Sequence, residues 1–174
     1  MAQGDFRLIW LFTRVIEDLL HDVPRQFELS PVQFAAMRYV DLHEQPNLGA
    51  IAEALAVSNA AATKLVDRLV RRGYMRRAEG AVDRRARQLS LTPEGAALLA
   101  AAADETMRRM GEILDRLPAE VREDLRRGLE GFLAAALRTP EDVRRICLRC
   151  GREHMRSCPG DRLYEELGGG ARTV

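Results

Sequence analysis

The stretch that decides the fold is Ser58-Asn-Ala-Ala-Ala-Thr-Lys-Leu-Val-Asp-Arg-Leu-Val-Arg-Arg-Gly73. Its apolar residues recur at helical spacing. The face that they would bury consists of Ala62, Leu65, Val66, Leu69 and Val70. Ser58 is a favourable N-cap, and Gly73 is a favourable stop after the last turn. The pattern therefore predicts a helix over 58–72 whose other face is polar and basic.

The segments on either side place this helix in a known motif. A short helix is predicted over 49–56, and the tight break at 57–59 separates it from the longer helix. After Gly73, two short half-apolar runs at 74–77 and 87–91 flank a charged tip, which predicts a two-stranded hairpin. Two helices joined by a tight turn and followed by a basic hairpin form a winged helix-turn-helix, whose second helix enters the major groove of DNA.

The remaining helices form two long flanking regions. The first is predicted over 6–23, where Pro24 closes it, and a capping box at Ser30 starts another that ends near His43. Further helices start at Thr92, Pro118 and Thr139; the last runs into three cysteines, and the glycines at 168–170 are expected to fray. The predicted fold is mainly α with a small β-hairpin wing. We expect an N-terminal dimerisation helix at 1–29, a DNA-binding lobe at 30–91, dimerisation helices at 92–138 and a Cys/His-rich extension at 139–174.

Composition narrows the class of protein. The chain has 174 residues, of which 47% are hydrophobic and only 5% aromatic, so an aliphatic, mostly helical core is expected. Every long apolar stretch is interrupted by charged residues, and the start of the chain does not have the pattern of a signal peptide, so we expect a cytoplasmic protein that does not enter a membrane. No nucleophile elbow, P-loop or dinucleotide fingerprint is present, so the sequence does not predict an enzyme.

Charge is concentrated in the predicted DNA-binding lobe. The formal net charge of the whole chain is only +1, but residues 64–91 contain nine basic and three acidic side chains. A basic block on a slightly acidic body is typical of a protein with one face that meets a polyanion. We therefore expect double-stranded DNA as a partner.

Individual contacts follow from the position of each side chain. Asn59 suits adenine, Thr63 suits a base or a phosphate, and the two alanines after Asn59 are short enough to touch a thymine methyl. Basic residues further along the helix would hold phosphates, and Arg85 at the hairpin tip would enter the minor groove. The predicted DNA-binding residues are Ser58, Asn59, Ala60, Ala61, Thr63, Lys64, Arg68, Arg71, Asp83, Arg84 and Arg85.

Five segments in order resemble the signature of MarR-type transcriptional regulators. They are Ser30-Pro-Val-Gln-Phe, Ile51-Ala-Glu-Ala-Leu, Lys64-Leu-Val-Asp-Arg-Leu-Val-Arg-Arg-Gly, Asp83-Arg-Arg and Leu91-Thr-Pro-Glu-Gly. The resemblance covers about 6–137. It implies a homodimer in which the first helix and the last two long helices intertwine, with two lobes on the halves of a palindrome. It also implies a small-molecule effector, commonly a phenolic or other aromatic acid, between the dimer helices and the lobe.

The predicted function is that of a transcriptional repressor. The protein would bind a palindromic DNA operator as a homodimer. A small ligand, a metal or the redox state of the C-terminal cysteines would alter its occupancy. The alternative is a winged-helix protein-interaction or metal-handling protein that does not bind DNA. Salt dependence separates the two, because DNA binding weakens steeply as salt rises.

The C-terminal extension contains a candidate metal site. Cys147, Cys150, His154 and Cys158 have the spacing C-x2-C-x3-H-x3-C, and three thiolates with one imidazole make a tetrahedral set that suits zinc. One continuous helix would spread these side chains over about 16 Å, so the site requires a helix break at Gly151. An iron–sulfur cluster on the same four residues, metal-free reactive thiols and an inert tail remain alternatives.

Overall fold

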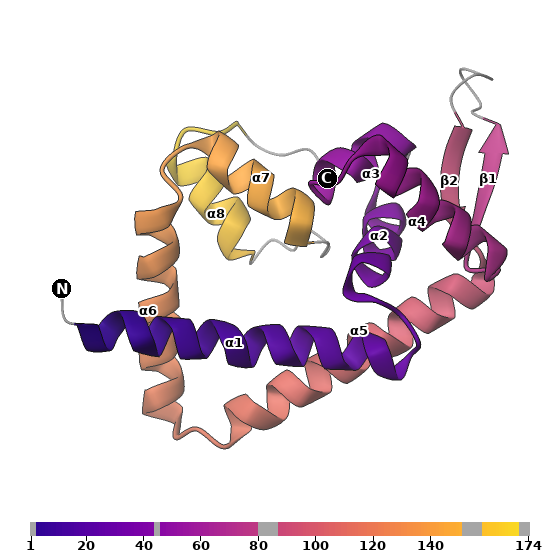
Figure 1. Cartoon of the computed structure of the whole chain (residues 1–174). Coiled ribbons are helices and arrows are strands. Elements are labelled where there is room, and N and C mark those ends of the chain that lie inside the picture. The colour runs from indigo at the N-terminus through magenta and orange to yellow at the C-terminus, as the bar shows by residue number, and fades with distance from the viewer. Residues whose placement is uncertain (1–2, 44–45, 80–86, 151–157, 171–174) are drawn as a thin grey trace.

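The computed structural model describes residues 3–43, 46–79, 87–150 and 158–170 (Figure 1). This part of the chain is mainly α-helical with a two-stranded sheet, as the sequence predicts. In chain order the elements are α1 Gln3–Gln26, α2 Pro31–Leu42, α3 Leu48–Ala54, α4 Asn59–Arg71, β1 Met75–Glu79, β2 Arg87–Leu91, α5 Pro93–Asp115, α6 Ala119–Ala136, α7 Pro140–Cys150 and α8 Pro159–Glu166. Among the described helices, none is long and apolar enough to cross a membrane.

The hydrophobic core lies in the lobe formed by α2, α3, α4, the hairpin and the start of α5. Ile51, Val66 and Leu69 are fully buried there, and Met75 from β1 and Leu89 from β2 cover them. The predicted inner face of α4 is confirmed: three of its residues are buried, and Leu65 and Val70 pack against the same core. Burial of this face fixes which side of α4 is left for solvent.

Local capping fixes the helix starts. The predicted capping box is present: the Gln33 N–H donates to Ser30 Oγ at 3.2 Å, and the Ser30 N–H donates to Gln33 Oε1 at 2.8 Å. Between α3 and α4, Ala56 takes the left-handed conformation with φ +53°, and the Val57 N–H donates to the Ala52 carbonyl at 2.9 Å. This closed turn ends α3 and sets the direction of α4.

The hairpin is anchored at its base. β1 and β2 pair antiparallel, with Met75 opposite Leu91. The Leu89 N–H donates to the Pro46 carbonyl, and the Thr92 N–H donates to the Tyr74 carbonyl, both at 3.1 Å. The wing strands therefore have a fixed position relative to α4 and to the start of α5.

Helices α1, α5 and α6 form a long arm that extends away from α4 and the hairpin (Figure 1). The prediction that Pro24 closes the first helix is wrong: α1 continues to Gln26 with Pro24 buried inside it. Proline lacks an N–H, but its carbonyl still accepts bonds from Phe27 and Leu29, so the last turn holds. The short helix is also slightly displaced, since it covers 48–54 rather than 49–56.

The C-terminal extension folds into two helices. Helix α7 is described up to Cys150, and the predicted break at Gly151 lies outside the described residues. Helix α8 was not predicted, although Pro159 at its first turn is a helix-start signal. The expected fraying at 168–170 is wrong at Gly168 and Gly169: the φ of Gly168 is +86°, its N–H donates to the Glu165 carbonyl, and the Gly169 N–H donates to the Tyr164 carbonyl. These glycines close α8 instead of leaving it open.

Candidate nucleic-acid interface

The exposed face of α4 presents most of the predicted DNA-contacting residues. Helix α4 and the hairpin lie on the same side of the molecule (Figure 1). The residues of this face that are exposed are Ser58, Asn59, Ala60, Ala61, Lys64, Arg68 and Arg71, and Thr63 is half-buried. The structure therefore brings the predicted reading residues and the predicted phosphate-binding residues onto one helix.

The first turn of α4 uses two of its polar side chains internally. The Ala61 N–H donates to Ser58 Oγ at 3.2 Å, so this hydroxyl caps the helix. The Thr63 hydroxyl donates to the Asn59 carbonyl at 2.8 Å, so its oxygen and methyl group remain for an outside contact. The Asn59 side chain is exposed at the positive end of the helix dipole. Within the described part of the chain, the Asn59 side chain takes no part in the hydrogen bonds of this first turn, and its contact with a base stays a prediction.

Three basic side chains form a ridge along α4, which we call the α4 ridge: Lys64, Arg68 and Arg71. Their spacing of four and three residues places them on one helix face. Within the described part of the chain, Lys64 and Arg68 have no ion-pair partner, and Arg71 donates only to the carbonyl of Asp67, at 3.4 Å. Their charges are therefore available to an external anion.

Two other arginines of the basic block are structural. Arg72 is paired with Glu28 at 3.3 Å and lies over the Tyr74 ring at 4.8 Å. Arg77 is paired with Asp67 at 2.6 Å, which ties β1 to α4. The sequence count of basic residues includes both, although their charges are neutralised within the fold. An acidic residue beside a predicted DNA-binding surface would repel phosphate, but the charge of Asp67 is paired with Arg77.

The tip of the wing lies outside the described residues. Asp83, Arg84 and Arg85 fall between the end of β1 at Glu79 and the start of β2 at Arg87. Their DNA contacts stay a prediction.

The predicted metal site is only partly described. Cys147 and Cys158 are free and half-buried, whereas His154 and the side chain of Cys150 lie outside the described residues. Among the residues that the structure does describe, no group of three or more metal-binding side chains lies together. The zinc and iron–sulfur hypotheses stay untested.

A pocket that the sequence did not reveal lies between α2 of the lobe and α5 of the arm. It has a volume of about 280 Å³, and its walls include Phe34, Leu99 and Met107. Arg38 also lines it, with the guanidinium 5.5 Å from the centre of the Phe34 ring. Arg38 is not among the site residues predicted from the sequence, because nothing in its sequence neighbourhood shows that α5 packs beside it.

The neighbouring Tyr39 is part of the lobe core. Its ring stacks on His43 with 3.9 Å between centroids, and its side chain is buried. Burial, and secondarily the charge of Glu53, raises the pKa of the Tyr39 hydroxyl above its ordinary value. Tyr39 is therefore a neutral packing residue at physiological pH.

The fold and the α4 ridge define a winged helix-turn-helix DNA-binding protein. Comparison with known proteins supports the same class. A family model described as MarR family matches residues 29–86. The transcriptional regulator HosA of Escherichia coli O157:H7 is 34% identical over 105 residues, which cover 59% of this chain and 74% of HosA. The chain belongs to the MarR family, and it is a transcriptional regulator rather than an enzyme.

Solved structures agree with this fold. MepR, a transcription regulator of the Staphylococcus aureus multidrug efflux pump MepA, has a TM-score of 0.70 at 19% identity, covering 78% of this chain and 99% of MepR. A mutant of MepR bound to an oligodeoxyribonucleotide has a TM-score of 0.60 at 18% identity, with the same coverage of both chains. At this level of identity the likeness establishes the fold.

Proposed function

We propose that this protein is a homodimeric repressor that binds a palindromic DNA operator. The observation that carries the proposal is the α4 ridge, whose Lys64 and Arg68 are exposed and unpaired within the described residues. A basic helix projecting from a winged lobe fits the major groove, with its first turn at the bases and its ridge along the phosphates. Bound to an operator, such a dimer excludes other proteins from the same DNA.

The arm supports the homodimer. Phe6, Leu8 and Trp10 on α1 are each more than half exposed, and Phe132 on α6 is 56% exposed. Helix α6 has no buried residue among those that the structure describes. An exposed apolar area of this extent marks an interaction surface. A second copy covers it by two-fold symmetry, which also pairs two lobes for the two halves of a palindrome.

The first prediction concerns the phosphate contacts. Replacing Lys64 and Arg68 together by alanine removes four cationic side chains from a dimer. Each phosphate contact contributes about 0.9 to the slope of log affinity against log salt, so we expect the slope to become shallower by about 3 to 4. The measurement is fluorescence anisotropy on a duplex of arbitrary sequence over a range of KCl concentrations.

Asn59→Ala is the matched control on the same helix. It removes a base contact and no charge, so the salt slope should match that of the wild type, while the bases enriched from a pool of random duplexes should change. An unchanged slope in the Lys64/Arg68 variant would remove the α4 ridge from the interface. Absence of any duplex binding by the wild type would favour the alternative of a winged-helix protein-interaction or metal-handling protein.

We also propose that the pocket between α2 and α5 binds a small aromatic acid that acts as effector. The lining includes the guanidinium of Arg38 together with the carboxylates of Asp41 and Asp104, and Phe34, Leu99 and Met107 supply apolar walls. A ligand carboxylate would have to bind at Arg38 and away from the two aspartates. The pocket is built by one helix of the lobe and one of the arm. A ligand that fills it therefore changes the position of the lobe relative to the arm, and so the spacing of the two DNA-reading helices.

The second prediction tests this pocket with 4-hydroxybenzoate as the probe. Loss of a charged hydrogen bond costs about 1.5–3 kcal/mol, so Arg38→Ala should weaken calorimetric binding of the probe by about tenfold or more. The exposed Arg144→Ala on α7 is the control and should leave the affinity unchanged. Equal binding by wild type and the Arg38 variant would place the effector elsewhere.

A further inference from the structure

The C-terminal extension brings two thiols to one point. A Cβ atom built on Gly160 would lie 3.3 Å from Cys147 Sγ and 3.6 Å from Cys158 Sγ. Both thiols belong to described residues, and both are free and half-buried. Two atoms this close to one point lie within about 7 Å of each other, a gap that rotation about the two Cα–Cβ bonds narrows toward bonding distance. We call Cys147 and Cys158 the thiol pair.

The packing of α7 and α8 holds the thiol pair together. Cys147 belongs to α7, and Cys158 immediately precedes α8, which packs against α7. Gly160 has no side chain, so the space that both sulfurs face stays open. The fold has therefore already met the entropy cost of bringing the thiols together, and each thiol encounters the other far more often than a thiol of another molecule.

We propose that the thiol pair is an oxidation site at which a peroxide forms the Cys147–Cys158 disulfide. One thiolate attacks a peroxide oxygen, the O–O bond breaks, and the sulfur becomes a sulfenic acid while one water leaves. The other thiolate then attacks this sulfur, forms the S–S bond and displaces the sulfenic oxygen as a second water. The two thiols lose two electrons and two protons in all, and one hydrogen peroxide becomes two water molecules.

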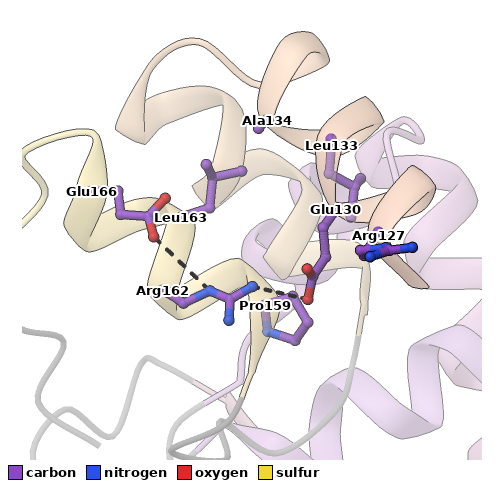
Figure 2. Close-up of a pocket in the computed structure, with 9 residues that line it drawn as sticks. Arg127, Glu130, Leu133, Ala134, Pro159, Arg162, Leu163 and Glu166 are labelled. Carbon is purple, nitrogen blue, oxygen red and sulfur yellow. Dashed lines mark hydrogen bonds and ion pairs between the residues drawn. The ribbon is translucent and has the colours of Figure 1, made fainter. Parts of the chain in front are cut away.

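The disulfide joins two helices that contact different parts of the molecule. Helix α7, with Val143 buried, packs against α2 and α3 of the DNA-binding lobe. Helix α8 lines a pocket of about 450 Å³ together with α6 of the arm, where Arg162 pairs with Glu130 at 3.0 Å (Figure 2). Oxidation therefore fixes a covalent link between helices that contact the lobe and the arm. The effect on DNA affinity that follows rests on the proposed function.

The experiment treats the reduced, full-length protein with hydrogen peroxide and follows the loss of free thiols. We expect two thiols to disappear, with a loss of about 2 Da from the intact chain. Trypsin cleaves after Arg149 and Arg156, so each cysteine of the chain falls on a different peptide. Mass spectrometry of the unreduced digest should find the Cys147 peptide joined to the Cys158 peptide.

The matched control is Cys150→Ser, which removes the remaining cysteine and should leave the disulfide unchanged. Cys147→Ser and Cys158→Ser should each abolish it. Gly160→Val keeps every thiol but fills the space that both sulfurs face, so it should slow disulfide formation about tenfold. Circular dichroism of each variant shows whether it has folded like the wild type.

Three outcomes would overturn the proposal: thiols that peroxide leaves unchanged in the folded wild type, a disulfide that includes Cys150 or joins two chains, or bound zinc that shields both thiols from peroxide. DNA affinity is measured separately on the same samples. We expect oxidation to change it about fivefold or more in the wild type and to leave it unchanged in Cys147→Ser. A disulfide without duplex binding in either redox state contradicts the proposed function and leaves the oxidation site standing. Duplex binding by a protein whose thiols do not react contradicts the oxidation site alone.

Discussion

Replacing Gly95 by alanine is expected to destabilise the protein by about 3 kcal/mol or more, the upper end of what overpacking costs. A Cβ at this position would lie 2.0 Å from the carbonyl oxygen of Tyr74. The clash is with a backbone atom, which cannot be relieved by a change of side-chain rotamer. The same carbonyl accepts the Thr92 N–H at 3.1 Å, so the added methyl group separates the base of the wing from the first turn of α5.

The measurement is urea unfolding followed by circular dichroism at one protein concentration. Gly111→Ala on the same helix is the control, because a Cβ there would meet nothing within 4 Å beyond the neighbouring residues and backbone of its own helix. It should raise the free energy of unfolding by about 0.5–1 kcal/mol, since alanine is the better helix former. Equal stabilities for the two variants would contradict the close approach of α5 to the wing.

Placing lysine at both Leu8 and Phe12 is expected to abolish dimerisation at micromolar concentration. The two side chains are one helical turn apart on α1, and they are 70% and 41% exposed in the isolated chain. Burial of each is worth about 1.5–3 kcal/mol, and a two-fold dimer contains the pair twice, so about 6 kcal/mol or more is lost.

Sedimentation equilibrium measures the loss, and DNA affinity should fall with it because one lobe holds only half of a palindrome. Asp18→Lys, at an exposed polar position of the same helix, serves as the control and should remain dimeric. A double variant that stays dimeric would show that the α1 face does not form the interface.

The sequence was most informative where local chemistry sets the structure. The capping residues Ser30, Ser58 and Thr92 predicted the starts of α2, α4 and α5, and the apolar pattern predicted the buried face of α4. The prediction ended the first helix before Pro24, but α1 continues to Gln26, and the Pro24 carbonyl accepts the N–H groups of Phe27 and Leu29. The periodic pattern of a single helix therefore predicts its core face better than its last turn.

Long-range packing could not be predicted in this way. Asp67 and Arg77 are ten positions apart on different elements, and no local signal indicates that they pair. The pocket beside Arg38 depends on how α5 crosses α2, and the meeting of Cys147 with Cys158 depends on α8, a helix that the sequence did not predict. The sequence identified the basic residues of the site. The structure separates those whose charges are unpaired within the described residues, on the α4 ridge, from Arg72 and Arg77, whose charges are paired within the fold.

The central claim is that the protein binds DNA as a dimer through α4. Its most direct test is the salt dependence of wild-type binding to duplex DNA. Three ridge side chains in each of two lobes predict a slope of about −5 for log affinity against log salt. The complex should contain two chains per duplex, measured by analytical ultracentrifugation of a labelled duplex. A slope near zero, or one chain per duplex at saturation, would contradict the account.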